Sequence, residues 1–428
     1  MEIDEEKQPY ANRLFQCLVM SVRPLRVEEL AELFAILPNE EFTPGFNIGW
    51  RPEDPETFIL SACSTLVSIV TIFDDGDDDD DVRGNKVVQF SHFSVREYLT
   101  SSRIANSAPV SHFHILPKPA HTLLARACLS VLLQLDYTVD KTRIRNLPLA
   151  RYAAEHWLDH ARFEDVSLDV HDAMDCLFDK NKPHFAALLW LYDVEEFRGQ
   201  WWLSLHPIQP DIVPLYYAVM CGFRSLARRL LDAHPRDVNA RGGCHVTPLH
   251  AALHKEHLDL GVLLLERGAD MESRDLQDQT ALYVASSRGY AEVVRSLIDH
   301  GADLNVECGD ENEWPEVKWT PLHVASNNRR LEVARLLLRH GTDVNYQDNR
   351  GRSALDIGLR HGSNNVVRLL LDHRANADAL DKLEETALHD ASSRHPSDGS
   401  RSSSHSSSMA RTWMPRASSD GLRWTMQR

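Results

Sequence analysis

The sequence predicts a mainly α-helical protein whose C-terminal half is a solenoid of short repeats. Apolar residues recur at helical spacing through the first half of the chain. A six-residue phrase then returns at a fixed period in the second half, and a period of about 20–50 residues is typical of solenoids. The 428 residues are 43% hydrophobic and 25% charged, a composition that is ordinary for folded globular domains.

The repeated phrase begins as Thr-Pro-Leu-His-Ala-Ala at Thr247. Related phrases begin at Thr280, Thr320, Ser353 and Thr386, in steps of 33, 40, 33 and 33 residues. A more degenerate copy begins at Val213. A second phrase, Gly-Ala-Asp or Gly-Thr-Asp, stays in phase with the first at Gly268, Gly301 and Gly341. Together the two phrases resemble the ankyrin repeat, which implies stacked helix pairs that bind protein partners through hairpin tips and a concave helix face.

Each repeat carries the signals of two short helices. Thr at the start of the phrase can cap the first helix, and Pro follows where its missing N–H costs nothing. The second helix contains an apolar triplet such as 263–265, and the glycine after it suits a left-handed helix end. Arg374 takes the place of that glycine in one repeat, which predicts left-handed strain there. Helices this short need stacked neighbours to bury one face.

One repeat is longer than the others. The step from Thr280 to Thr320 is 40 residues, and the excess lies within residues 306–319. This insert, called the finger below, is rich in Glu and Asp and contains Trp314. We therefore expect one hairpin of the array to be longer than the rest and negatively charged.

The first 105 residues predict three helices followed by a β-hairpin. The helices are expected at residues 14–22, 30–37 and 54–70, and two β-prone runs follow at 66–73 and 86–90. An aspartate run at 74–81 separates the two β-prone runs. This order is the pattern of a winged-helix module. The predicted organisation is a winged-helix-like module at 1–105, an all-helical linker region at 106–210, five to six ankyrin repeats at 211–391 and a Ser-rich tail at 392–428.

Three phrases in the first half carry a second resemblance. They are Arg23-Pro-Leu-Arg-Val-Glu-Glu-Leu, Ile59-Leu-Ser-Ala-Cys-Ser-Thr-Leu-Val and Phe90-Ser-His-Phe-Ser-Val-Arg-Glu-Tyr-Leu. They resemble the segment after the NTPase module in fungal NACHT-type (STAND) ankyrin-repeat signalling proteins. The resemblance implies the sensing and regulatory half of such a protein. The chain contains no phosphate-binding Gly-x4-Gly-Lys-Ser/Thr motif, so we expect an NTPase module upstream of Met1 or, alternatively, a separate NTPase that the chain regulates in trans.

The tail, residues 392–428, is rich in Ser and Arg and leaves the repeat pattern. One interpretation is disorder, because such a composition cannot bury a core. The other is a frame-shifted ankyrin repeat. Reading residues 409–428 two nucleotides out of frame forces Gly, Asp and Ala at positions that restore the repeat phase. We favour the frame shift, and sequencing the transcript through these codons tests it.

The charge balance restricts the partners. Forty-six Lys and Arg against 63 Asp and Glu give a formal net charge of -17, which repels phosphate backbones and acidic membrane surfaces. The predicted third helix has no Lys or Arg, so a winged-helix nucleic-acid-binding factor is only a third alternative. No apolar run reaches the roughly 18 residues of a membrane span. Seven dispersed cysteines indicate a reducing compartment, and we expect a cytoplasmic protein, with the nucleus as an alternative.

No arrangement of residues in the sequence predicts catalysis. A nucleophile, base and oxyanion set is not apparent, and Ser94 is interpreted as a helix cap. His156 and His160, like His254 and His257, have a helical spacing that suits zinc, but the Glu of a His-Glu-x-x-His motif is missing. We therefore expect no catalytic residue, no metal site and no cofactor.

Protein binding is the positive prediction, with the chain acting as a non-enzymatic interaction scaffold. Ankyrin arrays bind partners through side chains that stacking leaves free. The candidates at the hairpin tips are Arg274, Leu276, Gln277, Trp314, Tyr346, Asn349 and Arg350. The candidates on the first helices are His254, Lys255, Arg288 and Asn327. Trp314 and Tyr346 are the expected anchors, because exposed aromatic residues dominate binding hot spots.

Overall fold

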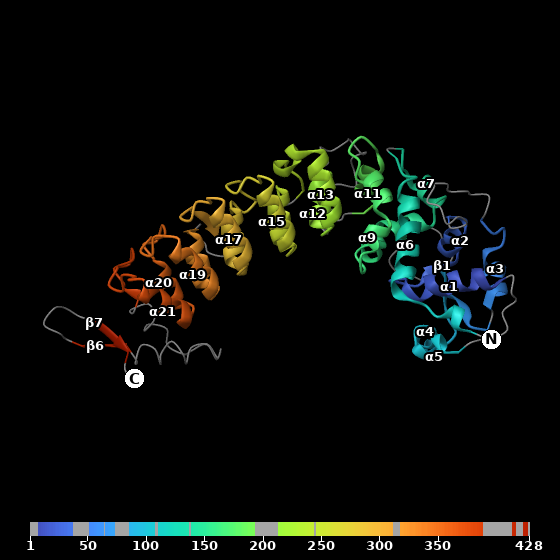
Figure 1. The fold of residues 1–428 in the computed structure, drawn as a ribbon, viewed down its shortest axis with the longest axis horizontal. Coiled ribbons are helices and arrows are strands. Elements are labelled where there is room, and N and C mark those ends of the chain that lie inside the picture. Colours follow the sequence, from blue (N-terminus) through green and yellow to red (C-terminus); the bar gives the residue numbers. More distant parts are fainter. Residues whose placement is uncertain are drawn as a thin grey trace. The chain divides into compact units, whose positions relative to one another are not determined.

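The computed structural model describes residues 7–36, 51–63, 65–72, 85–107, 110–136, 138–192, 213–243, 245–310 and 317–387, and the backbone of 413–416 and 423–426. The chain divides into two compact units. The first comprises residues 1–214 with 223–229, and the second comprises 215–222 with 230–428. Helices dominate both units, and Figure 1 traces their elements in chain order.

The first unit begins with three helices and a three-stranded sheet. The order is α1 (Gln8–Met20), β1 (Leu25–Arg26), α2 (Val27–Ile36), α3 (Pro55–Cys63), β2 (Val67–Ile72) and β3 (Asn85–Phe90). The strands lie in the order β1-β3-β2 and pair antiparallel, with Leu25 opposite Val88 and Val67 opposite Phe90. The three helices bury their apolar stripes together, and the fully buried side chains include Leu14, Phe15, Leu30 and Ile59.

Three features of this module differ from the sequence-based expectation. The helix at Phe93–Leu99 is capped by His92, whose Nδ1 accepts from the Ser94 N–H at 3.2 Å, and not by Ser94. The expected third helix over 54–70 ends at Cys63, because the β-branched run that follows pairs with β3 as β2. The sequence does not predict β1, because two residues are too few to show a period. The aspartate run at 74–81 lies outside the described residues.

Helices make up the rest of the first unit in the part that the structure describes. They are α4 (Phe93–Leu99), α5 (Ser102–Ala105), α6 (Pro117–Leu132), α7 (Lys141–Arg145), α8 (Leu149–Ala161), α9 (Val166–Asp169), α10 (His171–Leu177) and α11 (His184–Leu191), with a 3-10 turn, η3, at Ser111–Phe113. α8 packs along α6 and also on α2. Tyr152 and Trp157 of α8 are fully buried, so this helix is a central packing element of the unit.

Two histidines of α8 with the spacing of a zinc site take different partners. His160 is fully buried, and its Nε2 lies 2.9 Å from Tyr152 Oη while its Nδ1 lies 2.9 Å from His121 Nδ1. His156 Nδ1 lies 3.1 Å from an Asp159 carboxylate oxygen. Burial lowers the pKa of His160 to about 3, so its imidazole is neutral near pH 7. The two side chains therefore serve packing and local hydrogen bonding.

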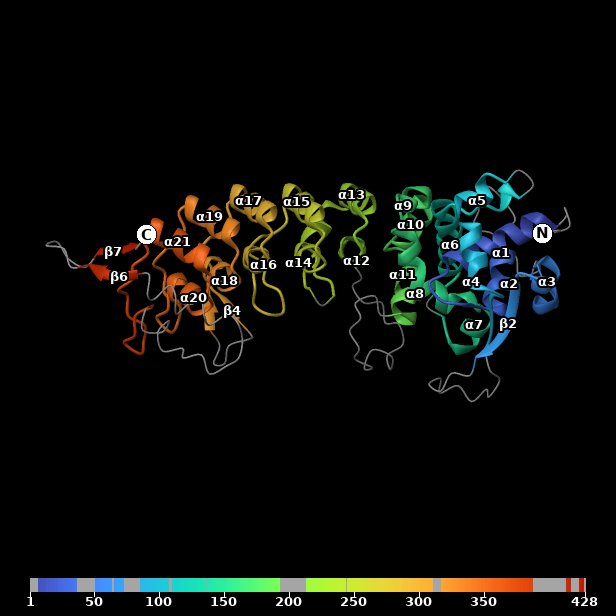
Figure 2. The same ribbon diagram turned by 90° about the horizontal axis from the view of Figure 1, so that it is seen from below.

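Helix pairs follow in register with the repeated phrases. The first helices are α12 (Pro214–Met220), α14 (Pro248–His254), α16 (Ala281–Arg288), α18 (Pro321–Asn327) and α20 (Ala354–Arg360). The second helices are α13 (Arg224–Ala233), α15 (Leu258–Glu266), α17 (Ala291–Asp299), α19 (Leu331–Arg339) and α21 (Asn364–Asp372), and a 3-10 turn, η5, lies at Pro235–Asn239. From α14 on, each helix packs on its counterpart in the next repeat, and Figure 2 shows first and second helices in two layers.

The repeated phrases form the helix ends that the sequence predicts. The N-caps of the first helices include Thr247, Thr280, Thr320 and Ser353. The second helices end in left-handed glycines with φ of 83°, 89° and 89° at Gly268, Gly301 and Gly341. Arg374 has a φ of 65°, which confirms the left-handed conformation predicted for this non-glycine residue.

The finger starts as an extended hairpin, as its length predicts. β4 (Cys308–Asp310) pairs antiparallel with β5 (Val317–Trp319), and Cys308 lies opposite Trp319. These strands pack with Tyr283, Val324 and Ile357 in one hydrophobic cluster, so the base of the finger belongs to the core. Trp314 and the rest of 311–316 lie outside the described residues.

Only two short strands of the tail are described, and only by their backbone. β6 (Trp413–Arg416) pairs antiparallel with β7 (Arg423–Met426). The remainder of residues 392–428 lies outside the described part of the chain. Disorder and a frame shift therefore both stay predictions.

Candidate functional site

One edge of the second unit consists of β-hairpin turns. Backbone bridges join Arg274 to Thr280, Gln347 to Ser353 and Leu380 to Thr386. An aspartate stands at the start of each turn, at Asp275, Asp348 and Asp381. One carboxylate oxygen of each accepts two backbone N–H bonds, from the residues two and four positions later, at 2.8–3.0 Å. These carboxylates fix the shape of the turns and so place the tip residues.

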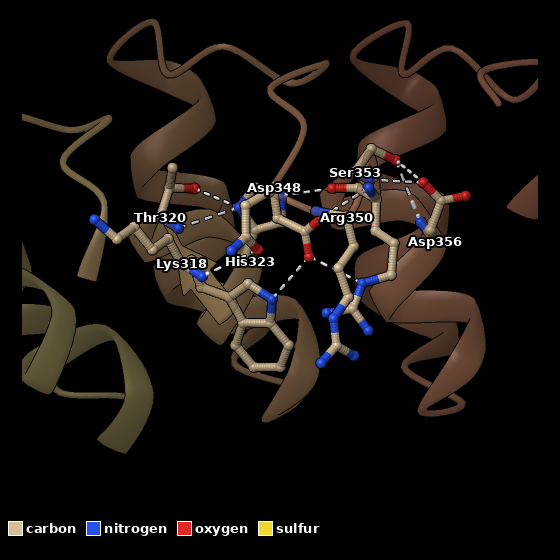
Figure 3. A network of polar contacts seen from close by, with 10 residues as sticks. Lys318, Thr320, His323, Asp348, Arg350, Ser353 and Asp356 are labelled. Carbon is tan, nitrogen blue, oxygen red and sulfur yellow. Dashed lines mark hydrogen bonds and ion pairs between the residues drawn. The ribbon is translucent and has the colours of Figure 1, made fainter. Parts of the chain in front are cut away.

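The second carboxylate oxygen has different partners in Asp275 and Asp348. Asp275 Oδ2 lies 3.3 Å from His254 Nε2. Asp348 Oδ2 instead accepts from Trp319 Nε1 at 3.2 Å and from Arg352 Nε at 2.9 Å. Figure 3 shows Asp348 between the caps of two successive first helices, formed by Thr320 with His323 and by Ser353 with Asp356. The Asp348 and Arg352 side chains are 0% and 5% exposed, so their ion pair is structural and does not meet a partner.

In two of the described repeats, the histidine of the repeated phrase ties its repeat to the next one. His250 Nδ1 lies 2.8 Å from Thr247 Oγ1, and its Nε2 lies 3.1 Å from Gln279 O. His323 repeats this arrangement at 2.7 Å from Thr320 Oγ1 and 3.2 Å from Arg352 O. Burial lowers the pKa of His323 to about 4, so the neutral ring accepts from the hydroxyl and donates to the carbonyl. Each of these rings therefore links the cap of its own helix to the hairpin of the following repeat.

The finger is held at its base by hairpins on both sides. Arg274 Nη2 donates to the Glu307 carbonyl at 3.1 Å, and Tyr346 Oη donates to the Glu307 carboxylate at 2.8 Å. The hydrogen bond to this carboxylate raises the pKa of Tyr346. Arg274 also forms an ion pair with Asp278 at 2.9 Å. Two candidate binding residues, Arg274 and Tyr346, therefore have an intramolecular role, and both are half-buried.

The other candidates at the tips are more accessible. Leu276 is 66% exposed, and the exposed Asn349 accepts from the Lys318 N–H at 3.4 Å. Gln277 and Arg350 are half-buried. Sequence reasoning misses Leu383, which is 77% exposed at the tip of the next hairpin. Its position two residues after Asp381, equivalent to Arg350 after Asp348, is the signal that could have identified it.

Of the candidates on the first helices, His254 and Arg288 contact each other, whereas Lys255 and Asn327 lie apart from them. His254 Nδ1 lies 3.3 Å from Arg288 Nη2, and the His254 ring stacks on His245 with centroids 4.5 Å apart. Burial lowers the pKa of His245 to about 4, which keeps this second ring neutral near pH 7. Lys255 is exposed. Asn327 donates to Asn328 at 3.0 Å, and its own buried Oδ1 has no hydrogen-bond partner among the described residues.

The described residues offer little for metal, thiol or membrane chemistry. No group of three or more His, Cys, Asp and Glu side chains among them could hold a metal ion. Burial raises the pKa of the Cys17 thiol to about 12, which makes it a poor nucleophile. Within the described part of the chain, no helix has the length and apolar character to cross a membrane.

Comparison with known families identifies the repeated region. The family model for ankyrin repeats matches three overlapping segments, at 215–308, 272–348 and 307–382. These segments coincide with the helix pairs and hairpins described above. Residues 215–382 are ankyrin repeats. The ankyrin part of the predicted fold is thereby confirmed.

Curated relatives share the repeats and, in one case, more of the chain. Azaphilone pigments biosynthesis cluster protein L of Monascus ruber is 29% identical over 284 residues, which cover 63% of this chain and 57% of the relative. This alignment is longer than the segment 215–382, so the similarity extends beyond the matched ankyrin repeats. Ankyrin repeat and SAM domain-containing protein 6 of Mus musculus is 38% identical over 97 residues, 22% of this chain and 11% of the relative. The chain thus spans just over half of the first relative and a small part of the second.

Proposed function

We propose that this protein is a non-enzymatic protein–protein interaction scaffold. It binds a protein partner through the ankyrin hairpin tips and the adjoining first helices. The contrast between buried polar groups and exposed tip residues in the repeats carries this proposal. The buried groups, such as Asp348 and His323, are bonded within the array, whereas tip residues such as Leu276 project outward. Tips held rigidly in this way are preorganised, which lowers the entropic cost of binding.

Site-specific crosslinking tests this proposal. A photo-crosslinking residue at position 276 should give a discrete crosslinked protein in the source cells, and the same residue at the exposed position 295 on α17 should not. Adding Arg350→Glu should reduce the crosslink from position 276 at least tenfold without changing the thermal unfolding midpoint. Equal crosslinking from positions 276 and 295 would contradict the proposal.

We further infer that the first unit is a winged-helix-like module followed by a helical linker region, with boundaries at 1–105 and 106–210. The element order α1-β1-α2-α3-β2-β3 and the sheet order β1-β3-β2 support the winged-helix interpretation. On this basis the chain is the sensing and regulatory half of a NACHT-type signalling protein. A phosphate-loop motif encoded in frame upstream of Met1 would support this role. A co-purifying separate NTPase would support regulation in trans.

Nucleic-acid binding is a weaker alternative for the same module. α3 (Pro55–Cys63) contains Glu56 and neither Lys nor Arg, whereas a recognition helix needs basic side chains to approach phosphates. Specific retention of the protein on a DNA column at physiological salt would favour nucleic-acid binding as the function of this module.

The free cysteines of the described residues fit a reducing compartment, and we place the protein in the cytoplasm as part of this proposal.

A further inference from the structure

The turns that join the two helices of each repeat form a second edge of the array. Four of them, at residues 254–257, 287–290, 327–330 and 360–363, are together called the interhelical edge. Each turn links the C-terminal end of a first helix to the N-terminal end of the second, so these turns lie at the opposite end of the helix pairs from the β-hairpins.

The interhelical edge is basic in an acidic protein. Five of its 16 residues are Lys or Arg and one, Glu256, is acidic, whereas the whole chain contains 63 acidic and 46 basic residues. The basic residues are Lys255, Arg288, Arg329, Arg330 and Arg360, so each of the four repeats contributes at least one. Lys255, Arg329 and Arg330 are exposed, and the other two are half-buried.

Contacts between successive turns make this edge continuous. Arg288 Nη1 lies 3.7 Å from a Glu256 carboxylate oxygen in the preceding repeat. Arg330 Nε donates to Ser287 O at 3.0 Å, and Arg329 Nη2 donates to a main-chain carbonyl of the following repeat at 2.8 Å. A carbonyl oxygen accepts a hydrogen bond but carries no formal charge, so these two bonds hold the guanidinium groups in place without neutralising them.

Arg329 has a backbone conformation that usually favours glycine. Its φ is 60°, and the equivalent positions of the neighbouring repeats are Gly289 and Gly362, with φ of 87° and 68°. Glu256, with φ of 62°, is the equivalent residue in the repeat that contains Lys255. The Arg329 side chain is exposed, so burial does not offset the cost of about 1 kcal/mol for a left-handed residue. The backbone would therefore accept glycine at 329, and the arginine adds a positive charge there.

We propose that the interhelical edge binds an extended acidic segment of a protein partner. Packed helices lie about 8–10 Å apart, so the cations of successive repeats recur at about this distance. A polyproline II segment rises about 3.1 Å per residue with three residues per turn, which places every third side chain on one face about 9 Å from the last. The segment therefore carries a carboxylate at every third residue in this conformation. The proposal rests on the protein-binding function proposed above and specifies the chemistry of the partner at Lys255 and Arg288.

Carboxylates beside the edge favour a ligand of low charge density. Asp259, Glu292 and Glu332 begin the second helices, where the helix dipole stabilises them, and Glu332 lies 3.7 Å from Arg335 Nε. These groups and the formal charge of -17 repel a nucleic acid, which carries a phosphate at every nucleotide. A segment with one carboxylate in three residues places its charges beside the turns and few elsewhere.

Two labelled peptides of identical composition test the spacing. The first is four repeats of Glu-Pro-Pro, and the control has four Glu residues followed by eight Pro residues. Fluorescence anisotropy with the full chain at low ionic strength should show saturable binding of the first peptide and about fivefold weaker binding of the control, because only the first places a carboxylate beside each repeat. The binding should weaken as salt is raised. Absence of saturable binding, equal binding of the two peptides, or tighter binding of a labelled single-stranded oligonucleotide would overturn the proposal.

Three variants separate the edge from general electrostatic attraction. Arg329→Gly removes one cation from the edge and should weaken binding of the Glu-Pro-Pro peptide about threefold without lowering the thermal unfolding midpoint. Arg339→Ala removes an exposed cation at the other end of α19 and should leave the binding unchanged. Glu256→Gln removes the acidic residue of the edge and should tighten the binding about threefold, a gain that misfolding cannot produce. Equal weakening in Arg329→Gly and Arg339→Ala, or unchanged binding in Glu256→Gln, would rule out the site.

The crosslink from position 276 separates this proposal from the protein-binding function on which it rests. Loss of peptide binding with that crosslink retained would refute the interhelical site alone. Absence of both would refute the protein-binding function as well.

Discussion

One buried polar group of the first unit has a partner much further along the chain than the polar groups that link the repeats. In the first unit, the buried Glu32 carboxylate accepts from Arg51 Nη2 at 2.7 Å and from the Leu149 N–H at 2.6 Å, and Leu149 lies 117 residues away. In the ankyrin repeats, His323 and Asp348 find their inter-repeat partners 29 residues away. This long-range contact of the first unit therefore fixes elements that are distant in the sequence against one another. In the repeats, the histidine contact recurs at His250 and His323 and joins neighbouring repeats in the same way each time.

This comparison predicts how much of the molecule a single substitution destabilises. Loss of a long-range buried group should destabilise the whole first unit, because it joins elements that share one core. Loss of a contact between repeats should act mainly on the two repeats that it joins, because solenoid stability is a sum of repeat and nearest-neighbour terms.

The largest effect is expected from Glu32→Gln. The substitution keeps the size of the side chain but leaves one acceptor oxygen for two donors, Arg51 Nη2 and the Leu149 N–H, and a donor left without its partner here costs about 3 kcal/mol. Urea denaturation should show this loss in the transition of the first unit, with the repeat transition unchanged. Glu56→Gln is the control, because its pair with Lys86 is solvent-exposed and contributes little to stability. Similar losses in the two variants would contradict the comparison.

Gly351→Ala tests the short-range coupling of the repeats. Gly351 has a φ of 80°, and a Cβ there would lie 2.9 Å from Lys382 N and 3.1 Å from Asp381 Cα in the next hairpin. Left-handed strain and overpacking together should lower the free energy of unfolding by about 3 kcal/mol. Hydrogen exchange should rise in the two adjoining hairpins and little elsewhere.

Gly341→Ala is the matched control for Gly351→Ala. Gly341 also has a positive φ, 89°, but a Cβ there would meet nothing within 4 Å. Only the conformational penalty of about 1 kcal/mol is expected. If both alanine variants lose the same free energy of unfolding, the close approach of successive hairpins does not contribute to stability.

The same contrast explains what could be predicted from the sequence. Caps such as Thr247 and the helix-ending Gly268 are local signals, and their period places the helix pairs along the chain. The partners of Glu32 and the pairing of β1 are set by tertiary arrangement, and no short-range pattern encodes them. The first half of the fold could therefore be predicted only as separate elements.

The candidate site divides in the same way. Position within the repeat is enough to identify Leu276 as an exposed tip residue. Position alone does not show that the Tyr346 hydroxyl is bonded to Glu307, because that bond depends on how the longer hairpin lies against its neighbour. Tyr346 is consequently a weaker candidate for a binding anchor than the sequence indicates.

His323 provides a pH-dependent test of the links between repeats. Its pKa in the folded protein is about 4, below the ordinary 6.5, so the unfolded chain binds a proton first as the pH falls. The stabilisation is complete above pH 6.5 and is lost as the pH falls toward 4. His323→Asn should therefore lose about 2 kcal/mol less than the wild type between pH 7 and pH 5. Parallel stability curves for the two proteins over this range would show that the histidine does not carry the acid sensitivity.

The smallest effect, and the only stabilising one, is expected from Arg374→Gly. Arg374 holds a φ of 65° at a helix end where three other repeats place glycine. Replacing it removes the left-handed penalty, and the gain of about 1 kcal/mol is reduced by the greater freedom of glycine in the unfolded chain. The reverse change, Gly268→Arg, should cost a similar amount, because a Cβ at Gly268 meets nothing within 4 Å. Urea denaturation of both variants measures these changes in the free energy of unfolding. If the free energy of unfolding rises in one variant by as much as it falls in the other, the helix ends of different repeats are interchangeable. We do not expect such an exchange of residues to be neutral in the first unit, where each element has its own partners.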